Sequence, residues 1–196
     1  MLGVNPGISL IVGLGNPGPE YAETRHNAGF RFLDAVLSVT GVRPRHEARF
    51  AGDVARVEVH GRDIWLLAPQ TFMNNSGDAV VKFAHYYKIP PAAILVAYDE
   101  IDLEPGVVRL KVGGGTAGHN GLTDITEKLG ALDCARLRIG VGHPGSAAQV
   151  ASYVLRRAPA SEQKLIDAAI ERARGHLPDI VQGHHQKVMN AMHADK

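Results

Sequence analysis

The chain has 196 residues, of which 45% are hydrophobic and 21% are charged, the composition of one ordinary globular domain. The net charge of +1 excludes a strongly basic nucleic-acid binder, and the single cysteine, Cys134, excludes an intramolecular disulfide. No apolar run approaches the roughly 20 residues that span a bilayer, and residues 1–9 lack a signal-like basic region, so we expect a cytoplasmic protein without a membrane segment.

Strands and helices alternate along the sequence. Short, β-branched apolar runs bounded by turn residues predict strands, and apolar residues at helical spacing predict helices. In chain order, the predicted elements are a strand at Ile8–Leu14, a helix at Ala28–Val39, strands at Val54–Val59 and Ile64–Ala68, a helix at Asn74–Lys88, strands at Ala93–Tyr98 and Val107–Val112, a helix at Asn120–Leu129, a strand at Leu137–Val141, and helices at Glu162–His176 and Ile180–His193.

One predicted hairpin interrupts this alternation. Gly61-Arg62-Asp63 forms a turn between the two strands of residues 54–68. An antiparallel pair beside strands that are joined through helices indicates a mixed sheet. We therefore predict an α/β fold with a single domain over residues 1–196, in which a mixed, mostly parallel β-sheet is sandwiched between α-helices.

The first glycine-rich segment has the spacing of a dinucleotide-binding loop. Gly13, Gly15 and Gly18 spell G-x-G-x-x-G after a predicted strand. However, Pro17 and Pro19 interrupt the segment, whereas a dinucleotide-binding loop enters its helix at once. The pattern therefore argues against nucleotide binding here.

The second glycine-rich segment, Gly113–Gly118, has the spacing of a P-loop start. His119-Asn120 follow it where a Walker A motif needs lysine and then serine or threonine, so phosphate binding of that kind is excluded. The glycines fit either a flexible hairpin turn or a loop that approaches a ligand closely.

Metal-dependent and serine-dependent chemistries lack their signatures. The sequence has no H-E-x-x-H motif, no cysteine cluster and no G-x-S-x-G elbow. Cys134 precedes a strand and is interpreted as a buried structural thiol. We expect neither a metal ion nor a cofactor.

Polar or ionisable residues follow the ends of several predicted strands. In open α/β sheets, ligands bind outside the carboxyl ends of the strands, so we expect these side chains to meet at one edge. They are Asn16, Asn74, Asp99, His119 and Asn120, joined by His26 from the loop that leaves the first strand. The sequence therefore predicts a polar site at that edge.

This set of residues suits the attack of water on a carbonyl group. His26 can act as the general base because an imidazole has a pKa near neutrality, and Asp99 can bind its other ring nitrogen. Asparagine amides can donate hydrogen bonds to the oxyanion. A structural alternative stays open, in which His26 bonds the backbone at a helix start and the asparagines at 74, 75 and 120 are helix caps.

Charge is distributed unevenly along the chain. Residues 1–135 carry 12 basic and 15 acidic residues, a net charge of −3. Residues 136–196 carry 9 basic and 5 acidic residues, a net charge of +4. The basic part suggests an anionic partner, and a solvated helical surface is the alternative.

Several segments together resemble those of bacterial peptidyl-tRNA hydrolases. The matching segments are Val12–Gly18 with Tyr21, Thr24–Gly29, Thr71–Asn74, Asp99-Glu100, Gly113–Leu122, Arg136–Gly140 and Tyr153–Leu155. They are spread over most of the chain, and the C-terminal region resembles the family least.

The resemblance implies hydrolysis of the ester bond between peptide and tRNA, by a metal-independent cytoplasmic monomer with a mixed sheet between helices. It implies that His26 is the general base and Asp99 its partner, with Asn16 and Asn74 completing the catalytic set. Asn16 would recognise the N-blocked aminoacyl group. The residues implied to bind the peptide and the tRNA 3′ end are Tyr21, Phe72, Met73, Asn74 and Asn120. Lys111 and Arg138 would contact phosphates of the acceptor stem.

Two other functions compete with this interpretation. One is a non-catalytic RNA-binding protein of the same fold, and the presence of His26, Asp99, Asn16 and Asn74 together argues against it. The other is a peptidase or amidase that acts on small substrates, and the basic C-terminal part with Arg138 favours a nucleic-acid substrate instead.

Overall fold

A single β-sheet forms the centre of the protein in a computed structural model that describes residues 5–130 and 133–194. Within these ranges the sheet has seven strands in the order β2-β3-β4-β1-β5-β7-β6. The strands are β1 (Leu10–Gly13), β2 (Arg45–Glu47), β3 (Gly52–Val59), β4 (Arg62–Pro69), β5 (Ile94–Glu100), β6 (Val108–Val112) and β7 (Ala135–Gly140). Residues 1–4, 131–132 and 195–196 of the predicted domain lie outside the described residues.

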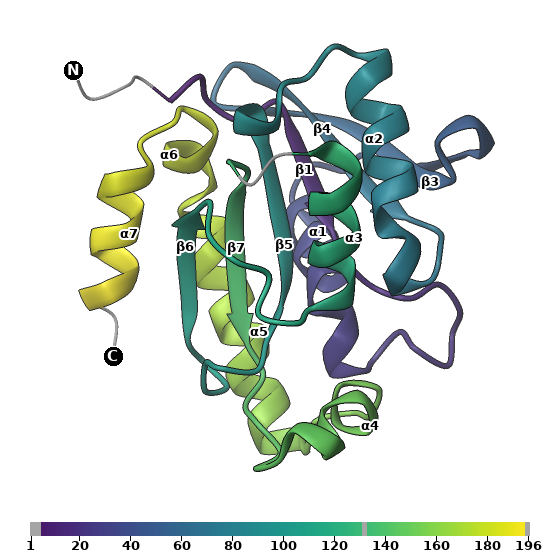
Figure 1. The fold of residues 1–196 in the computed structure, drawn as a ribbon. Helices are drawn as coiled ribbons and strands as arrows, with labels where there is room; N and C mark the ends of the chain where they lie inside the picture. The colour runs from purple at the N-terminus through teal and green to yellow at the C-terminus, as the bar shows by residue number, and fades with distance from the viewer. Residues whose placement is uncertain (1–4, 131–132, 195–196) are drawn as a thin grey trace.

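Helices cover both faces of this sheet (Figure 1). The α-helices are α1 (Ala28–Ser38), α2 (Ser76–Tyr86), α3 (Asn120–Leu129), α4 (Val150–Val154), α5 (Ala160–Gly175), α6 (Leu177–Val181) and α7 (His185–Ala194). Buried residues of α1, α5, α6 and α7 belong to one hydrophobic cluster, and those of α2 and α3 belong to a second one on the opposite face. The predicted α/β fold with a sheet between helices is confirmed.

The four central strands run parallel. β1 pairs with β4 on one side and with β5 on the other, and β5 pairs with β7. The flanking pairs β2–β3, β3–β4 and β6–β7 are antiparallel, so the sheet is mixed as predicted. Because β4, β1, β5 and β7 point the same way, their carboxyl ends share one edge of the sheet.

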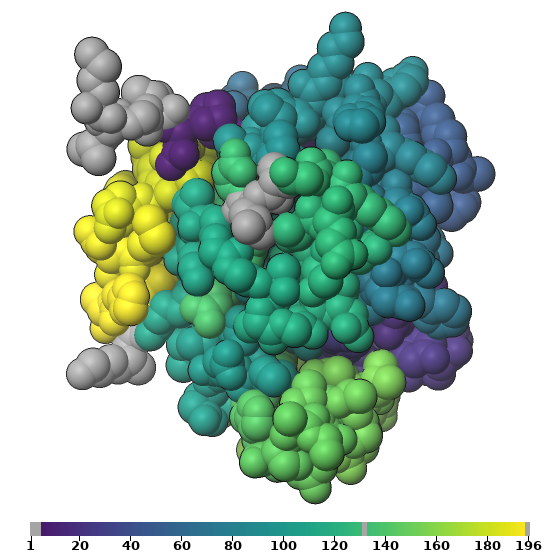
Figure 2. Space-filling model, in the orientation of Figure 1, coloured from purple at the N-terminus to yellow at the C-terminus, as the bar shows by residue number. Residues whose placement is uncertain are grey.

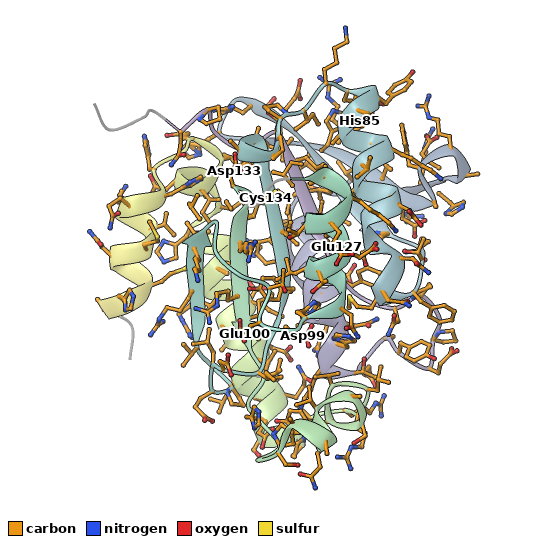
Figure 3. All side chains as sticks on the ribbon, viewed as in Figure 1. His85, Asp99, Glu100, Glu127, Asp133 and Cys134 are labelled. Atoms are coloured by element: carbon orange, nitrogen blue, oxygen red, sulfur yellow. The ribbon has the colours of Figure 1, made fainter. Side chains whose placement is uncertain are left out.

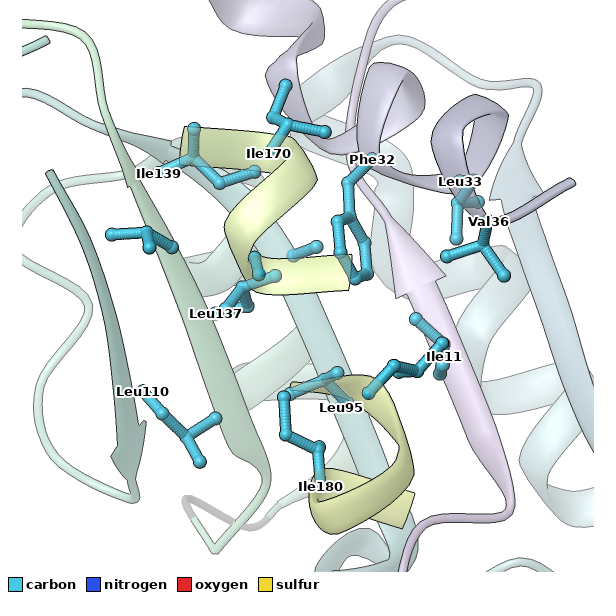
Figure 4. Packing of buried hydrophobic residues seen from close by; sticks show 14 of the residues in the cluster. Ile11, Phe32, Leu33, Val36, Leu95, Leu110, Leu137, Ile139, Ile170 and Ile180 are labelled. Carbon is cyan, nitrogen blue, oxygen red and sulfur yellow. The ribbon is translucent and has the colours of Figure 1, made fainter. Parts of the chain in front are cut away.

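The larger hydrophobic cluster fixes α1 and α5 against the sheet (Figure 4). Phe32 of α1 lies between Ile11 of β1 and Ile170 of α5, and none of the three is more than 3% exposed. Burial of a side chain of this size contributes roughly 1.5–3 kcal/mol. Helix α1 is therefore a rigid support for the residues that precede it.

Three features differ from the prediction. The helix expected at Ile180–His193 is wrong, because the chain turns at Gly183 (φ +83°) and separates α6 from α7. The short elements β2 and α4 were not predicted, since their three and five residues carry too little periodicity. Strand β5 continues through Asp99 and Glu100, so Asp99 lies within the strand and not after it.

In the described ranges, none of the helices has the length and apolar character that crossing a membrane requires.

Gly29 permits the close approach of α1 to the sheet. A Cβ at this position would overlap backbone atoms of Ala97 and Leu14, which cannot swing aside as a flexible side chain can. We predict that Gly29→Ala lowers the free energy of unfolding by about 1–3 kcal/mol, because overpacking forces the helix off the sheet. Urea unfolding measures this loss.

Gly175→Ala is the matched control. A Cβ at Gly175, the last residue of α5, meets nothing within 4 Å, so this variant should be as stable as wild type or slightly more stable. A Gly29→Ala variant within 0.5 kcal/mol of wild type would contradict the close-packing argument.

Candidate active site

A cavity of about 570 Å³ lies at the carboxyl ends of the parallel strands. In Figure 3, Asp99 and Glu100 mark this end of β5, and in Figure 2 the light-green segment with α4 forms a lobe below it. Eight of the ten residues predicted for the site line this cavity. They are Asn16, Tyr21, His26, Phe72, Met73, Asn74, Asp99 and Asn120.

Two histidines share the carboxylate of Asp99. Nδ1 of His26 lies 2.9 Å from Oδ2 of Asp99, and Nε2 of His119 lies 2.8 Å from Oδ1. The two imidazole rings are 5.1 Å apart between centroids. Asp99 is only 2% exposed, so both contacts are sheltered from water and strong.

Each partner stabilises the charged form of the other. Burial alone would raise the pKa of Asp99, but the charges and hydrogen bonds of His26 and His119 outweigh it and hold the pKa of this carboxyl well below its ordinary range. Burial alone would lower the pKa of His26, but the charge and hydrogen bond of Asp99 raise it above the ordinary histidine value. The lowered pKa favours the ionised form of Asp99, and this carboxylate in turn favours an imidazolium on His26.

The contact also sets the tautomer of His26. An ionised carboxylate only accepts hydrogen bonds, so the neutral imidazole carries its proton on Nδ1, where it donates to Asp99. The lone pair is then on Nε2. A neutral His26 in this tautomer can accept a proton from water or from a substrate hydroxyl.

A tight turn presents His26 to the cavity. His26 lies in the 3₁₀ turn Arg25–Asn27, between the loop after β1 and the start of α1. The guanidinium of Arg25 donates to the carbonyl oxygens of Tyr153 and Arg157 at 3.2 and 3.1 Å and forms an ion pair with Glu162. These contacts join the turn to the segment that carries α4.

The side chain of Asn16 connects two loops. Its Oδ1 accepts a hydrogen bond from the backbone N–H of Met73 at 2.7 Å, which connects the loop after β1 with the loop after β4. Asn16 is only 6% exposed. The residues that the sequence placed after different strands thus meet by direct contact.

Asn74, Asn75 and Asn120 do not cap helices through their side chains. The N-cap of α2 is Asn75, which makes no side-chain capping bond, and Asn74 lies inside the preceding 3₁₀ turn. The N-cap of α3 is His119, whose side chain accepts from the N–H of Leu122. Asn74 and Asn120 are both exposed where they line the cavity.

Part of the cavity lining is an apolar wall. Phe72 is 58% exposed and stacks edge-on against Tyr21, with the ring centroids 6.3 Å apart. Val150, Val154 and Leu155, in and directly after α4, line the same space. The site therefore combines the polar groups around His26 and Asp99 with an apolar wall.

Lys111 and Arg138 lie outside this cavity lining. They occupy the neighbouring strands β6 and β7, where Lys111 pairs with Arg136 and Arg109 pairs with Arg138. Directly opposed residues of an antiparallel pair share one face, so the four cations lie on the same face of the two strands. Arg136 is only 2% exposed and donates to the carbonyl oxygen of Gly115, so the basic patch consists of Arg109, Lys111 and Arg138. Lys111 is exposed, and Arg138 is half-buried with its Nε 3.0 Å from Glu100.

His119 was expected at the edge of the sheet but not in the catalytic set. Its position directly after a glycine-rich loop and before a helix was the only available signal in the sequence. Its contact with Asp99 depends on how the loop folds over β5, and the spacing of residues in the chain does not encode this.

His26, Asp99 and His119 also form a group that could hold a metal ion. Their ligand atoms lie within 4.8 Å of one another. One ring nitrogen of each histidine is already at hydrogen-bond distance from an oxygen of Asp99, which explains why the three groups are close.

Comparison with known proteins gives one consistent family. The family model described as peptidyl-tRNA hydrolase matches residues 10–196. The peptidyl-tRNA hydrolase of Acinetobacter baumannii is 51% identical over 189 residues, covering 96% of this chain and 97% of that protein. The peptidyl-tRNA hydrolase of Azotobacter vinelandii is 50% identical over 190 residues, covering 96% and 98%.

A solved structure agrees with these sequences. The crystal structure of peptidyl-tRNA hydrolase from Acinetobacter baumannii superposes with a TM-score of 0.93 at 50% identity and covers 96% of each chain. The resemblance seen in the sequence motifs is confirmed.

The carboxylate of Asp99 should set the titration of His26. We predict that the His26 imidazole titrates above the ordinary histidine value in the wild type and that Asp99→Asn moves its pKa down, because loss of the negative charge destabilises the imidazolium. NMR titration of the histidine ring signals measures both values.

Asp53→Asn is the control for this experiment. It removes an exposed carboxylate that lies 2.9 Å from a different histidine, His46, so the titration of His26 should not change. An unchanged pKa of His26 in Asp99→Asn would contradict the proposed electrostatic coupling.

Proposed function

The chain belongs to the peptidyl-tRNA hydrolase family, and from this premise we propose that it cleaves the ester bond between the peptide and the ribose of peptidyl-tRNA. The products are a free peptide and a free tRNA that can re-enter translation. The observation that carries the proposal is the buried His26–Asp99 pair at the floor of a cavity that Asn16, Asn74 and Asn120 also line.

Water is the proposed nucleophile and His26 the proposed base. Nε2 of His26 takes a proton from a water molecule while the water oxygen attacks the ester carbonyl carbon. The tetrahedral intermediate then collapses, and the bond between the carbonyl carbon and the ribose oxygen breaks. The imidazolium returns its proton to the departing ribose oxygen, so His26 is neutral again after each turnover.

Asp99 has a supporting role in this scheme. It holds the reactive tautomer of His26 and stabilises the imidazolium while the proton is on Nε2. His119 binds the other oxygen of the same carboxylate and so restricts its rotation. General base catalysis of this type contributes on the order of 100- to 10,000-fold in rate.

Asparagine amides supply the proposed hydrogen-bond donors. We assign Asn74 to the oxyanion of the tetrahedral intermediate, where one donor is commonly worth roughly 2.7–4 kcal/mol, and Asn120 to contacts with the peptide and the tRNA 3′ end. We assign Asn16 to the blocked amino group, which distinguishes peptidyl-tRNA from free aminoacyl-tRNA. The exposure of Asn74 and Asn120 at the cavity supports these roles.

The remaining predicted residues fit the two ends of the substrate. Tyr21, Phe72 and Met73 lie beside the apolar wall and suit contacts with the peptide and the tRNA 3′ end. Lys111 and Arg138 belong to the basic patch on β6 and β7, and we assign them to phosphates of the acceptor stem.

We further propose that the enzyme works in the cytoplasm as a monomer, without a metal or cofactor. Peptidyl-tRNA arises in translation, and the proposed chemistry needs only water and the side chains of one chain.

A non-catalytic RNA-binding function and a small-substrate amidase are the competing proposals. A binding protein has no need of a buried carboxylate that orients a histidine towards a cavity, so the His26–Asp99 contact argues against the first. The basic patch, in which Arg138 contacts the cavity residue Glu100, argues against the second, since small substrates do not need it.

Removal of the base should abolish hydrolysis. We predict that His26→Ala loses nearly all activity on N-acetyl-aminoacyl-tRNA because the substitution removes the proposed acceptor of the water proton. Asp99→Asn should lower kcat more than it raises KM, since Asp99 acts on the base and not on the tRNA. Initial rates over a range of substrate concentrations measure both effects.

His46→Ala, which removes an exposed histidine outside the cavity, is the control and should keep the wild-type rate. Near-wild-type activity of His26→Ala would refute the proposed mechanism. A larger effect of Asp99→Asn on KM than on kcat would refute the orienting role of Asp99.

Phosphate contacts should make binding depend on salt. We predict that KM rises steeply with salt concentration and that Lys111→Gln reduces the slope of log KM against log salt concentration by about 1, because each phosphate contact releases about one counterion. Kinetics between low and physiological salt measure the slope.

Lys82→Gln on the exposed surface of α2 is the control and should leave the slope unchanged. If KM does not respond to salt, or if the two variants have equal slopes, the assignment of Lys111 to phosphate is wrong.

A further inference from the structure

Asn27 is a buried polar residue that the proposed mechanism does not use. It follows His26 directly and is only 2% exposed. It occupies the N-cap position of α1, yet its side chain makes no capping hydrogen bond to that helix. A buried amide needs partners, so the question is what its two polar atoms bind.

Both polar atoms of the Asn27 side chain bind the backbone of one residue, Asn16. Oδ1 of Asn27 accepts the N–H of Asn16 at 2.9 Å, and Nδ2 of Asn27 donates to the carbonyl oxygen of Asn16 at 2.9 Å. This two-point contact resembles the pairing of one strand residue with its neighbour. It requires a donor and an acceptor on the same short side chain, which an asparagine has and an aspartate lacks.

The residue after Asn16 favours a backbone conformation that allows this contact. Pro17 disfavours the helical conformation at the preceding residue, so Asn16 stays extended. Asn16 does not pair with a neighbouring strand of the sheet, because β1 ends at Gly13. The Asn27 side chain therefore replaces the missing strand neighbour at this position.

Asn16 in turn forms a hydrogen bond with the loop after β4. Its own Oδ1 accepts the N–H of Met73 at 2.7 Å, which fixes the rotation of the amide group. With the oxygen engaged, Nδ2 is the group of this amide that is left to donate, and Asn16 is one of the residues that line the cavity. Hydrogen bonds thus run without a break from the residue beside the base, through Asn16, to the turn that carries Asn74.

We propose that Asn27 is a positioning residue that sets the orientation of the Asn16 amide, and with it the selectivity for substrates with a blocked amino group. This inference rests on the proposed function, because Asn16 is the group assigned to that recognition. Asn27 touches neither the substrate nor the reacting atoms and acts only through Asn16.

Asn27→Asp tests the inference with almost no change in side-chain size. The new carboxylate oxygen faces the carbonyl oxygen of Asn16, which it repels, so the amide of Asn16 loses its fixed position. We expect kcat/KM for N-acetyl-aminoacyl-tRNA to fall about 10- to 100-fold, since small misplacements at a reacting centre cost this much. The rate on unblocked aminoacyl-tRNA should change much less, so the ratio of the two rates falls. Asn75→Asp is the matched control at an exposed asparagine without a side-chain capping bond and should keep the wild-type ratio.

A double-mutant cycle separates positioning from general destabilisation. If Asn27 acts through Asn16, Asn27→Asp should cause no further loss of selectivity in an Asn16→Ala background. If the loss of selectivity in the double variant equals the product of the two single losses, the residues act independently and the proposal is overturned. Unchanged selectivity in Asn27→Asp would also overturn it.

Hydrogen exchange supplies a readout that does not depend on activity. The backbone N–H groups of Asn16 and Met73 should exchange faster in Asn27→Asp, while that of Val96 in the centre of β5 stays protected and shows that the variant is folded. Wild-type protection of Asn16 and Met73 in the variant would refute the positioning role. If the wild-type enzyme fails to hydrolyse N-acetyl-aminoacyl-tRNA, the proposed function is wrong, whereas the exchange result still decides the positioning role.

Discussion

The carboxylate of Asp99 is the interaction on which the site depends. It lies at the end of a strand that is buried along its full length, and it accepts hydrogen bonds from His26 and His119, which come from two different loops. A buried carboxylate without these partners would be protonated or would draw water into the core. The two histidines keep it charged, and its charge in turn raises the pKa of His26.

Hydrogen bonds also connect the loops around the cavity. Asn27 pairs with the backbone of Asn16, and Asn16 pairs with the backbone of Met73, so the loops after β1 and β4 form one unit with the turn that carries His26. The glycines make this possible, because Gly29 lets α1 lie directly on the strands. These contacts fix the polar groups of the site relative to one another, which suits groups that must be in position before the substrate arrives.

The apolar wall and the basic patch suit the two ends of the proposed substrate. The wall beside Phe72 and α4 is part of the cavity, whereas the cations of β6 and β7 lie outside its lining. A substrate with an apolar peptide at one end and a polyanion at the other matches this arrangement, and the ester that joins the two would then lie over His26. The arrangement gives a physical reason for a family whose substrate is half peptide and half nucleic acid.

The amino-acid sequence is enough to predict the fold class, most of the strands and helices, and the edge of the sheet at which Asn16, Asn74, Asp99 and Asn120 gather. Apolar periodicity and the common direction of parallel strands encode these features locally. Tertiary structure alone decided the break between α6 and α7, the contact of His119 with Asp99 and the use of Asn27, whose side chain binds a neighbouring loop although its position in the chain is that of a helix cap. Such contacts depend on distances between loops that are far apart in the chain, and residue spacing carries no information about those distances.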